Sequence, residues 1–324
     1  MINIDDCWMT HERDEHGKLQ ADPDRFPHGI KWIADYAHAK GIKLGIYNDY
    51  GKKTCGGYPG SEGHLLDDAR TFAEWEIDYL KMDGCYGDPL DRNDGYPAMT
   101  RFLNETGRKI VYSCSWPAFS PDMDFSKLPP NCNLWRNFYD IKANWGNLRW
   151  VMDKFGNETH WANYAGPGHW NDADMILVGL KGGKLTREEE KTHFAIWSIL
   201  ASPLIMSNDL REISPQAVEI LRNKEIIAVD QDPLGRAGIR LTPFEELLAI
   251  WSRPLANGDV AVALLNQDDV ITDIKLDFKM IGTCMKYSIR DLYEHEELGV
   301  FEESYTGKSI PIHGVQMLRL TPIA

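Results

Sequence analysis

The sequence lacks basic runs, long apolar stretches and clustered histidines. Its 324 residues carry a formal net charge of −14 at pH 7. With this acidic balance, nucleic acid and anionic membranes are poor partners for the chain. A membrane-spanning helix needs about 18 consecutive apolar residues, and the sequence contains no such run, so we expect no membrane insertion. The histidines also lack the spacing of zinc ligands, which argues against a zinc site.

A secretion signal is missing as well. The opening residues MINIDDCWM contain neither a charged n-region nor an apolar h-region, which taken alone indicates a cytosolic protein. Two glycosylation sequons, beginning at Asn104 and Asn157, indicate a secreted glycoprotein instead. Six cysteines are present, and composition alone leaves their pairing open.

Short apolar strands alternate with amphipathic helices along most of the chain. Hydrophobic residues make up 43 % of the sequence, which is enough for a packed core. The expected strands are residues 2–6, 41–49, 77–82, 109–115, 132–140, 169–179 and 204–209. The expected helices lie near 30–37, 65–73, 94–107, 144–155, 186–202 and 214–223, and Thr186 with Glu189 forms a capping box.

This alternation predicts a parallel sheet with helices outside it. A (β/α)₈ TIM barrel needs eight strands and about 250 residues. The pattern supplies seven strand–helix units, so we expect a TIM barrel that lacks its first β/α unit, with that unit upstream of Met1.

The pattern changes after the segment QDPLGRAG. Residues 247–267 resemble two strands around an Asn257-Gly258 turn. Further strands are expected at 285–293 and 315–324, and no long helical pattern appears. We therefore expect a catalytic barrel over residues 1–239, followed by a C-terminal antiparallel β-sandwich over residues 240–324.

Polar residues follow nearly every expected strand of the barrel. Active sites of this barrel class lie at the C-terminal ends of the strands. In chain order these ends carry Asp5 and Asp6, Tyr47 and Asp49, Lys81 and Asp83, Ser115, Arg136 and Asp140, Asp172 and Asp174, and Ser207 and Asp209. A single aspartate here most often caps the next helix, which accounts for Asp49 and Asp209. Capping does not account for Lys81, because a lysine inside a barrel needs a charge partner. Asp83 points to the same side of the strand.

Several carboxylates at one barrel mouth have two chemical uses. One is a site for a hard metal ion, and the other is hydrolysis of a glycosidic bond by two carboxyl groups. Lys81 and Arg136 favour hydrolysis, because a cation site would not tolerate added positive charge. Tryptophan rings pack on sugar faces, although they fill large cores just as often. Four of them lie close to the strand ends, at Trp8, Trp116, Trp135 and Trp170.

Seven motifs, in order, resemble the family 27 glycoside hydrolases, the α-galactosidases and α-N-acetylgalactosaminidases. They are IDDCW, DPDRFPHGI, KLGIY, KMDGCY, CNLWRN followed by Asp140, AGPGHWNDADM and SNDLREISPQA. The likeness is dense from Asp5 to Pro233 and looser across the expected sandwich.

The resemblance implies roles for the strand-end residues. Asp83 matches the catalytic nucleophile and Asp140 the general acid/base of a retaining hydrolysis. Sugar-binding positions match Asp5, Asp6, Tyr47, Lys81, Arg136 and Asp174. A retaining mechanism requires the two carboxyl groups to lie about 5–5.5 Å apart, and Lys81 would keep Asp83 ionised. The resemblance implies neither a metal nor an organic cofactor.

The resemblance also bears on which sugar is bound, through the segment SCSWPAFS. In galactose-specific relatives, a larger acid and a larger aliphatic residue stand at the positions of Ser115 and Ala118. Small residues leave room for a 2-acetamido group, which the Ser115 hydroxyl could bond. We therefore expect terminal α-linked N-acetylgalactosamine of glycoconjugates as the main substrate and α-galactose as a weaker one. Alternatively, Ser115 and Ala118 only pack a strand end. Phe119 stands where the family often has tyrosine.

The resemblance pairs Cys55 with Cys85 and Cys114 with Cys132. Disulfides favour a lysosomal or secreted location for the full-length protein, although reduced buried cysteines are the alternative. The family partner of Cys7 lies upstream, and Cys284 has no evident partner. Relatives dimerise, so a homodimer is expected.

The family's first strand and helix, with a tryptophan that floors the sugar, would precede Met1. The chain is therefore expected to be a truncated form or a barrel without one strand. An open barrel exposes two strand edges, so this chain alone should be poorly soluble, with little or no activity. Two function classes remain: a retaining glycosidase, either N-acetylgalactosaminidase or galactosidase, and an inactive chain that at most binds sugar. A metal-dependent barrel hydrolase is a distant third.

Overall fold

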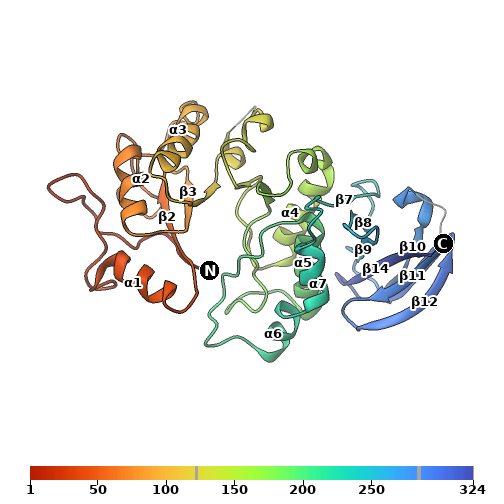
Figure 1. Ribbon diagram of the computed structural model, residues 1–324. Helices are drawn as coiled ribbons and strands as arrows, with labels where there is room; N and C mark the ends of the chain where they lie inside the picture. Colours follow the sequence, from red (N-terminus) through yellow and green to blue (C-terminus); the bar gives the residue numbers. More distant parts are fainter. Residues whose placement is uncertain (121–122, 283–285, 324) are drawn as a thin grey trace. The chain divides into compact units, whose positions relative to one another are not determined.

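The chain forms two compact units, Met1–Asn137 and Phe138–Ala324 (Figure 1). The computed structural model describes residues 1–120, 123–282 and 286–323, so Cys284 lies outside the described residues. Within these ranges, no helix combines the length and the apolar character needed to cross a membrane.

The first unit is built on a parallel sheet whose strands are neighbours in chain order. These strands are β1 (Ile2–Ile4), β2 (Leu44–Asp49), β3 (Tyr79–Asp83), β4 (Val111–Cys114) and β5 (Leu134–Arg136). The connecting helices are α1 (Gly29–His38), α2 (Leu65–Glu74) and α3 (Arg92–Glu105), coloured red to yellow in Figure 1. In α1 the buried residues Ile30, Ala34 and Ala37 share one helix face.

The register of the sheet brings the strand ends together. Tyr47 lies opposite Lys81, and Asp49 lies opposite Asp83, across β2 and β3. All six residues of β2 are buried. Because parallel strands end at one edge of a sheet, the polar residues at these ends are neighbours in the folded unit.

The second unit begins with helices around one short strand. They are α4 (Trp145–Asn157), α5 (Arg187–Leu200), α6 (Pro215–Leu221) and α7 (Lys224–Asp230), together with β6 (Trp170–Asp172). The capping box predicted at Thr186 and Glu189 is confirmed at the start of α5. Helix α7 was not predicted; its N-cap is Asn223, whose side-chain oxygen accepts hydrogen bonds from the N–H groups of Glu225 and Ile226.

The strand predicted over residues 204–209 is wrong. A single parallel bridge joins Met206 to Ile176. The backbone turns at Pro203, whose carbonyl accepts a hydrogen bond from Ile205. The side chain of Asn208 also donates a hydrogen bond to the Val178 carbonyl, which a regular strand would pair with a backbone N–H group. Polar side chains that bond to backbone groups in this way compete with a regular ladder.

The rest of the second unit is antiparallel β-structure. One sheet has the order β12-β11-β14-β9-β8-β7, and a second consists of β10 and β13. The bounds are β7 (Ile239–Arg240), β8 (Leu248–Pro254), β9 (Val260–Asn266), β10 (Thr272–Asp277), β11 (Lys286–Asp291), β12 (Glu296–Glu302), β13 (Ser304–Ile310) and β14 (Val315–Ile323). The predicted Asn257-Gly258 turn joins β8 and β9, with Gly258 at φ +89°.

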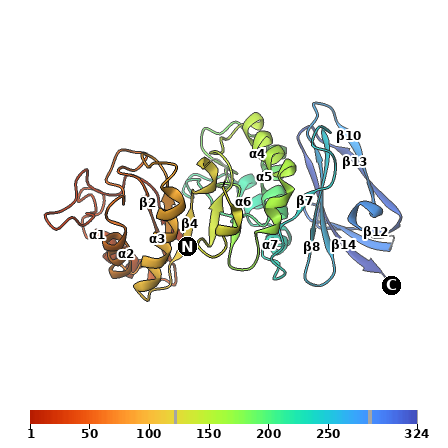
Figure 2. The ribbon, with the colours of Figure 1, turned by 90° about the horizontal axis from the view of Figure 1, so that it is seen from above.

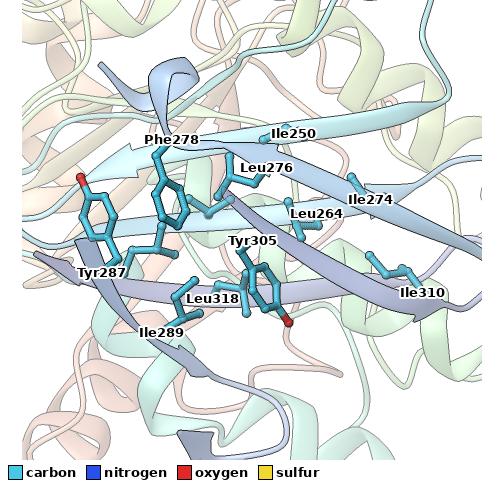
Figure 3. Packing of buried hydrophobic residues seen from close by; sticks show 12 residues of the cluster. Ile250, Leu264, Ile274, Leu276, Phe278, Tyr287, Ile289, Tyr305, Ile310 and Leu318 are labelled. Carbon is cyan, nitrogen blue, oxygen red and sulfur yellow. The ribbon is translucent and has the colours of Figure 1, made fainter. Parts of the chain in front are cut away.

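An apolar core fills the space between the two sheets. Figure 3 shows Leu276 and Tyr305 of the smaller sheet packed towards Leu264, Ile289 and Leu318 of the larger one. The opposite face of the larger sheet lies beside α5 and α7 (Figures 1 and 2), which belong to the same unit. Hydrogen bonds fix this contact: Thr192 donates to the His313 carbonyl at 2.7 Å, and Tyr293 donates to the Lys191 carbonyl at 2.6 Å.

Candidate functional site

Asp83 is the last residue of β3, and its carboxylate is held on both oxygens. Oδ2 accepts a hydrogen bond from the Tyr47 hydroxyl at 3.0 Å, and Oδ1 accepts one from the Gly84 N–H at 2.9 Å. Tyr47 is buried, and burial together with the negative charge of Asp83 raises the pKa of its hydroxyl above the usual value. Tyr47 therefore remains a neutral donor that orients the Asp83 carboxylate.

Lys81 pairs with Asp5 across the first and third strands. Its Nζ lies 2.9 Å from Asp5 Oδ2. Burial by itself would lower the pKa of Lys81, but the charges of Asp5 and Asp83 outweigh burial and raise this pKa. The charge partner that the sequence required is therefore Asp5, while Asp83 contributes to the field without bonding the ammonium.

Asp6 fixes a loop of the first unit. Its Oδ2 accepts a hydrogen bond from the Gly56 N–H at 2.7 Å, and its Oδ1 accepts one from the Cys7 N–H at 2.6 Å. These bonds place Asp6 next to Cys55. Among the described cysteines Cys7 is the free one.

Both predicted disulfides are present, Cys55–Cys85 and Cys114–Cys132. The first lies directly beside the nucleophile candidate, since Cys55 Sγ is 3.5 Å from Asp83 Oδ2. Because Cys85 follows Asp83 by two residues, this bridge ties the loop after β3 to the loop after β2.

The capping role expected for Asp49 and Asp209 is wrong. Helix α2 begins at Leu65, far from Asp49. Asp49 is buried and accepts hydrogen bonds from the N–H groups of Gly51 at 2.8 Å and Cys85 at 2.9 Å. Burial raises the pKa of Asp49 to about 7. Asp209 instead bonds Arg211.

Ser115, Ala118 and Arg136 also belong to the first unit. Ser115 follows β4, is buried, and donates its N–H to the Met82 carbonyl at 3.0 Å. Ala118 lies in a short 3₁₀ helix, Pro117–Phe119, and is half-buried. Arg136 ends β5 and is buried. Ser115 and Ala118 thus follow the strand that neighbours the strand of Asp83.

Asp140 and Asp174 belong to the second unit. Asp174 Oδ2 accepts a hydrogen bond at 2.8 Å from the N–H of Ile141, the residue that follows Asp140. Trp197 donates its Nε1–H to the Asp174 carbonyl at 2.6 Å. These bonds bring the segment of Asp140 to Asp174. The separation of about 5–5.5 Å between Asp83 and Asp140 stays a prediction.

One residue beside the nucleophile candidate carries no motif and was not predicted from the sequence. Tyr96, on α3, is completely buried and donates its hydroxyl to the Asp83 carbonyl at 2.8 Å. Nothing in the sequence signals this contact, because a buried tyrosine on a helix is usually a core residue. Its role depends on where the helix docks.

Two groups of side chains among the described residues could in principle surround a cation. One joins Asp49 and Asp83 to Cys55 and Cys85, whose sulfur atoms form a disulfide and so offer no thiolate. The other, Asp35 with His38 and Glu76, lies at the surface and already pairs with Lys31. That the site uses no metal stays a prediction.

Two family models match the sequence. A model described as alpha galactosidase A matches residues 1–232, and one described as alpha galactosidase C-terminal beta sandwich domain matches residues 245–320. Human (Homo sapiens) alpha-galactosidase A is 48 % identical over 272 residues, which cover 82 % of this chain and 63 % of the human protein. The alpha-N-acetylgalactosaminidase of Gallus gallus is 45 % identical over 307 residues, or 90 % of this chain and 74 % of that protein.

Solved structures share the fold over nearly the whole chain. Alpha-galactosidase I from Mortierella vinacea matches with a TM-score of 0.90 at 34 % identity, covering 99 % of this chain and 87 % of that one. A Saccharomyces cerevisiae α-galactosidase, solved with raffinose, matches with a TM-score of 0.86 at 27 % identity, covering 99 % and 89 %. The predicted fold class, a TIM-type barrel followed by an antiparallel sandwich, is confirmed.

Proposed function

Because the chain belongs to glycoside hydrolase family 27, the α-galactosidases and α-N-acetylgalactosaminidases, we propose that it is a retaining exo-glycosidase. It removes terminal α-linked N-acetylgalactosamine from glycoconjugates and acts more slowly on α-galactose. The mechanism is a double displacement. The activity is the one for which the relatives are named. The chain spans 63 % of the length of the human relative and 74 % of the length of the Gallus gallus relative.

The surroundings of Asp83 carry the proposal. A nucleophilic carboxylate must be ionised, oriented and close to a strand end. Asp83 accepts hydrogen bonds from Tyr47 and Gly84, and Lys81 adds positive charge to the same strand end. These contacts fix the orientation of the carboxylate at the end of β3. A strand-end aspartate that merely capped a helix would not need a buried tyrosine and a lysine beside it.

In the first step Asp83 attacks the anomeric carbon as the glycosidic bond breaks. Asp140 begins protonated and gives its proton to the leaving oxygen. In the second step Asp140, now a base, takes a proton from water, and the resulting hydroxide equivalent displaces Asp83 from the sugar. One water molecule is consumed and the anomeric configuration is retained. The two carboxyl groups and water suffice, and no cofactor enters.

The remaining strand-end residues bind the sugar in this proposal. Asp5, Asp6, Tyr47, Lys81, Arg136 and Asp174 are assigned to its hydroxyl groups. Asp5 and Lys81 already form one hydrogen-bonded pair, which presents an acceptor and a donor together. The Asp6 carboxylate accepts hydrogen bonds from two backbone N–H groups. Its proposed role is therefore to hold the loop in place as well as to bind the sugar.

Ser115 and Ala118 select the 2-acetamido sugar in this proposal. A small side chain at both positions leaves space for the acetamido group, and the Ser115 hydroxyl can bond to it. A site built to bond a substrate group discriminates more strongly than one that only accommodates its bulk. A preference for α-galactose is the second candidate, since the human relative at 48 % identity is named an α-galactosidase.

Hydrolysis of matched chromogenic α-N-acetylgalactosaminide and α-galactoside substrates tests the proposal. We expect turnover of both, faster for the first, and insensitivity to chelators. Asp83→Asn should abolish turnover while leaving the fold intact, which circular dichroism checks. An Asp83→Asn variant with near-normal turnover, or a wild type that binds these sugars without cleaving them, would contradict the proposed function.

We also propose an oxidising location, lysosomal or extracellular, for the full-length protein. The two disulfides of the first unit support this, because such bonds persist in secreted and lumenal proteins. Glycoconjugates with terminal α-galactosaminide or α-galactoside units are the proposed partners. A homodimer is proposed by family resemblance, and light scattering of the purified chain tests it.

A further inference from the structure

The first turn of α3 touches the two loops that carry the proposed nucleophile and the proposed sugar-selecting residues. Arg92, the first residue of α3, is only 6 % exposed. Its Nη2–H donates to the Gly84 carbonyl at 2.6 Å, and its Nη1–H donates to the Phe119 carbonyl at 2.8 Å. Gly84 follows Asp83, and Phe119 follows Ala118, so one guanidinium links both loops.

The guanidinium of Arg92 is unusual because its hydrogen bonds go to backbone carbonyl groups. No ion pair with a carboxylate of the described residues involves Arg92, and its Nε atom is buried without a hydrogen-bond partner. A buried cation is costly unless it is well bonded, so the two carbonyl contacts are what holds it. It packs closely, since a Cβ atom placed on Gly84 would lie 3.2 Å from Arg92 Cζ.

Asn93 and Tyr96, also near the start of α3, contact the same loops. Trp116, in the sugar-selecting loop, donates its Nε1–H to Asn93 Oδ1 at 3.2 Å. The rings of Trp116 and Tyr96 are stacked, with centroids 5.7 Å apart and planes 4° apart. The Tyr96 hydroxyl in turn donates to the Asp83 carbonyl at 2.8 Å. The turn is therefore a common anchor for the nucleophile loop and the sugar-selecting loop.

We propose that Arg92 is a positioning residue that sets the place of Ser115 and Ala118 relative to Asp83 and thereby the discrimination between 2-acetamido and 2-hydroxy sugars. The inference rests on the proposed function and deepens it. A planar guanidinium can donate to two carbonyl groups at once in a fixed geometry, whereas a lysine ammonium on a flexible stem cannot reproduce that fork. Small displacements of a positioned group have large effects on rate.

The test compares Arg92→Lys and Arg92→Gln with a matched control, Arg108→Lys. Arg108 also donates to two backbone carbonyls, of Ile77 and Glu76, but at the opposite end of β3. Arg92→Gln removes the buried charge and keeps one amide donor, so it remains informative if the lysine variant folds poorly. For each full-length protein, hydrogen exchange is measured by mass spectrometry over residues 83–88 and 115–120. The ratio of kcat/KM for the two chromogenic sugars is measured alongside.

Both Arg92 variants should lose protection in both segments by about tenfold, the effect of one lost hydrogen bond. They should also lower the ratio of N-acetylgalactosaminide to galactoside kcat/KM by about tenfold. Arg108→Lys should lower thermal stability and change neither readout. Exchange that rises in one segment alone, a ratio that does not move, or a control that behaves like the Arg92 variants overturns the proposal. If the wild type cleaves neither sugar, the proposed function fails, and the exchange data alone decide whether Arg92 couples the loops.

Discussion

At the scale of single residues, the site depends on how each carboxylate is held. The Asp83 carboxylate accepts hydrogen bonds from the Tyr47 hydroxyl and from a backbone N–H group. Asp49 lies opposite Asp83 on the neighbouring strand, is buried, and accepts hydrogen bonds from two backbone N–H groups. These surroundings distinguish Asp83, the proposed nucleophile, from Asp49, whose carboxylate holds the loops after β2 and β3. The sequence shows both as strand-end aspartates, and the structure distinguishes them by their partners.

Replacing Tyr47 with phenylalanine should lower kcat/KM by about 10²-fold, because it removes one preorganised donor to the proposed nucleophile, Asp83. The ring remains, so the core should keep its packing. Steady-state kinetics with the chromogenic substrates and a melting curve measure both effects. A Tyr47→Phe variant with unchanged kcat/KM would show that the 3.0 Å contact to Asp83 does not serve catalysis.

Ser115→Glu should shift the preference from the acetamido sugar to galactose. The longer acid fills the space proposed for the acetamido group and offers its carboxylate to a 2-hydroxyl. The ratio of kcat/KM for the two substrates should fall by at least about tenfold. Ser115→Ala is the control, since it removes the hydroxyl and keeps the space. An unchanged ratio in Ser115→Glu would refute the selectivity argument.

At the scale of helices, strands and turns, the sequence predicted correctly the features that depend on residues close together in the chain. The capping box at Thr186 and the Asn257-Gly258 turn are fixed by neighbouring residues, and both were found. The strand over residues 204–209 failed because an apolar run does not reveal that Ser207 and Asn208 bond to carbonyls of another segment. Tyr96 and Arg92 were missed for the same reason, since their partners come from the docking of α3.

The site itself divides in the same way. The strand-end acids and both disulfides could be named in advance, because motifs carry them. The pairing of Lys81 with Asp5 could not be named in advance. It depends on which strand ends are close in the folded sheet and on whether the two side chains are long enough to meet. The sequence supplied the set of polar residues, and the register of the sheet supplied their pairing.

Removing the cap of α5 gives a direct test at this scale. Thr186→Ala should lower the free energy of unfolding by about 1 kcal/mol, because it leaves the Glu189 N–H at the helix N-terminus without its partner. Thr186→Ser retains the hydroxyl and should be close to wild type. Chemical denaturation measures both, and an alanine variant as stable as the serine variant would show that the capping box contributes nothing.

At the scale of the whole molecule, two buried acids make stability depend on pH. Burial raises the pKa of Asp49 and of Asp230 to about 7, well above the 3.8 that is usual for an aspartate. The folded state then binds more protons than the unfolded state between about pH 4 and 7, so the free energy of unfolding falls as pH rises through this window. Other groups act in the opposite direction: burial lowers the pKa of His193 to about 3, and the hydrogen bond from Arg290 lowers the pKa of Glu225.

We therefore expect the protein to melt at a higher temperature at pH 4.5 than at pH 7. Asp230→Asn should flatten this dependence, because the amide removes one of the two titrating groups while keeping the shape of the side chain. The comparison between variant and wild type cancels the contribution of the histidines. A wild type whose melting temperature rises between pH 4.5 and 7, or an Asp230→Asn variant with the same slope, would contradict the assignment.

The central claim is that Asp83 forms a covalent bond to the anomeric carbon. A fluorinated α-galactosaminide or α-galactoside with a good leaving group, which slows the second displacement, should trap this intermediate. Mass spectrometry of the digested protein should then find one sugar adduct, on the peptide that contains Asp83, and none in Asp83→Asn. Turnover without any trapped adduct, or an adduct on another carboxyl group, would contradict the account.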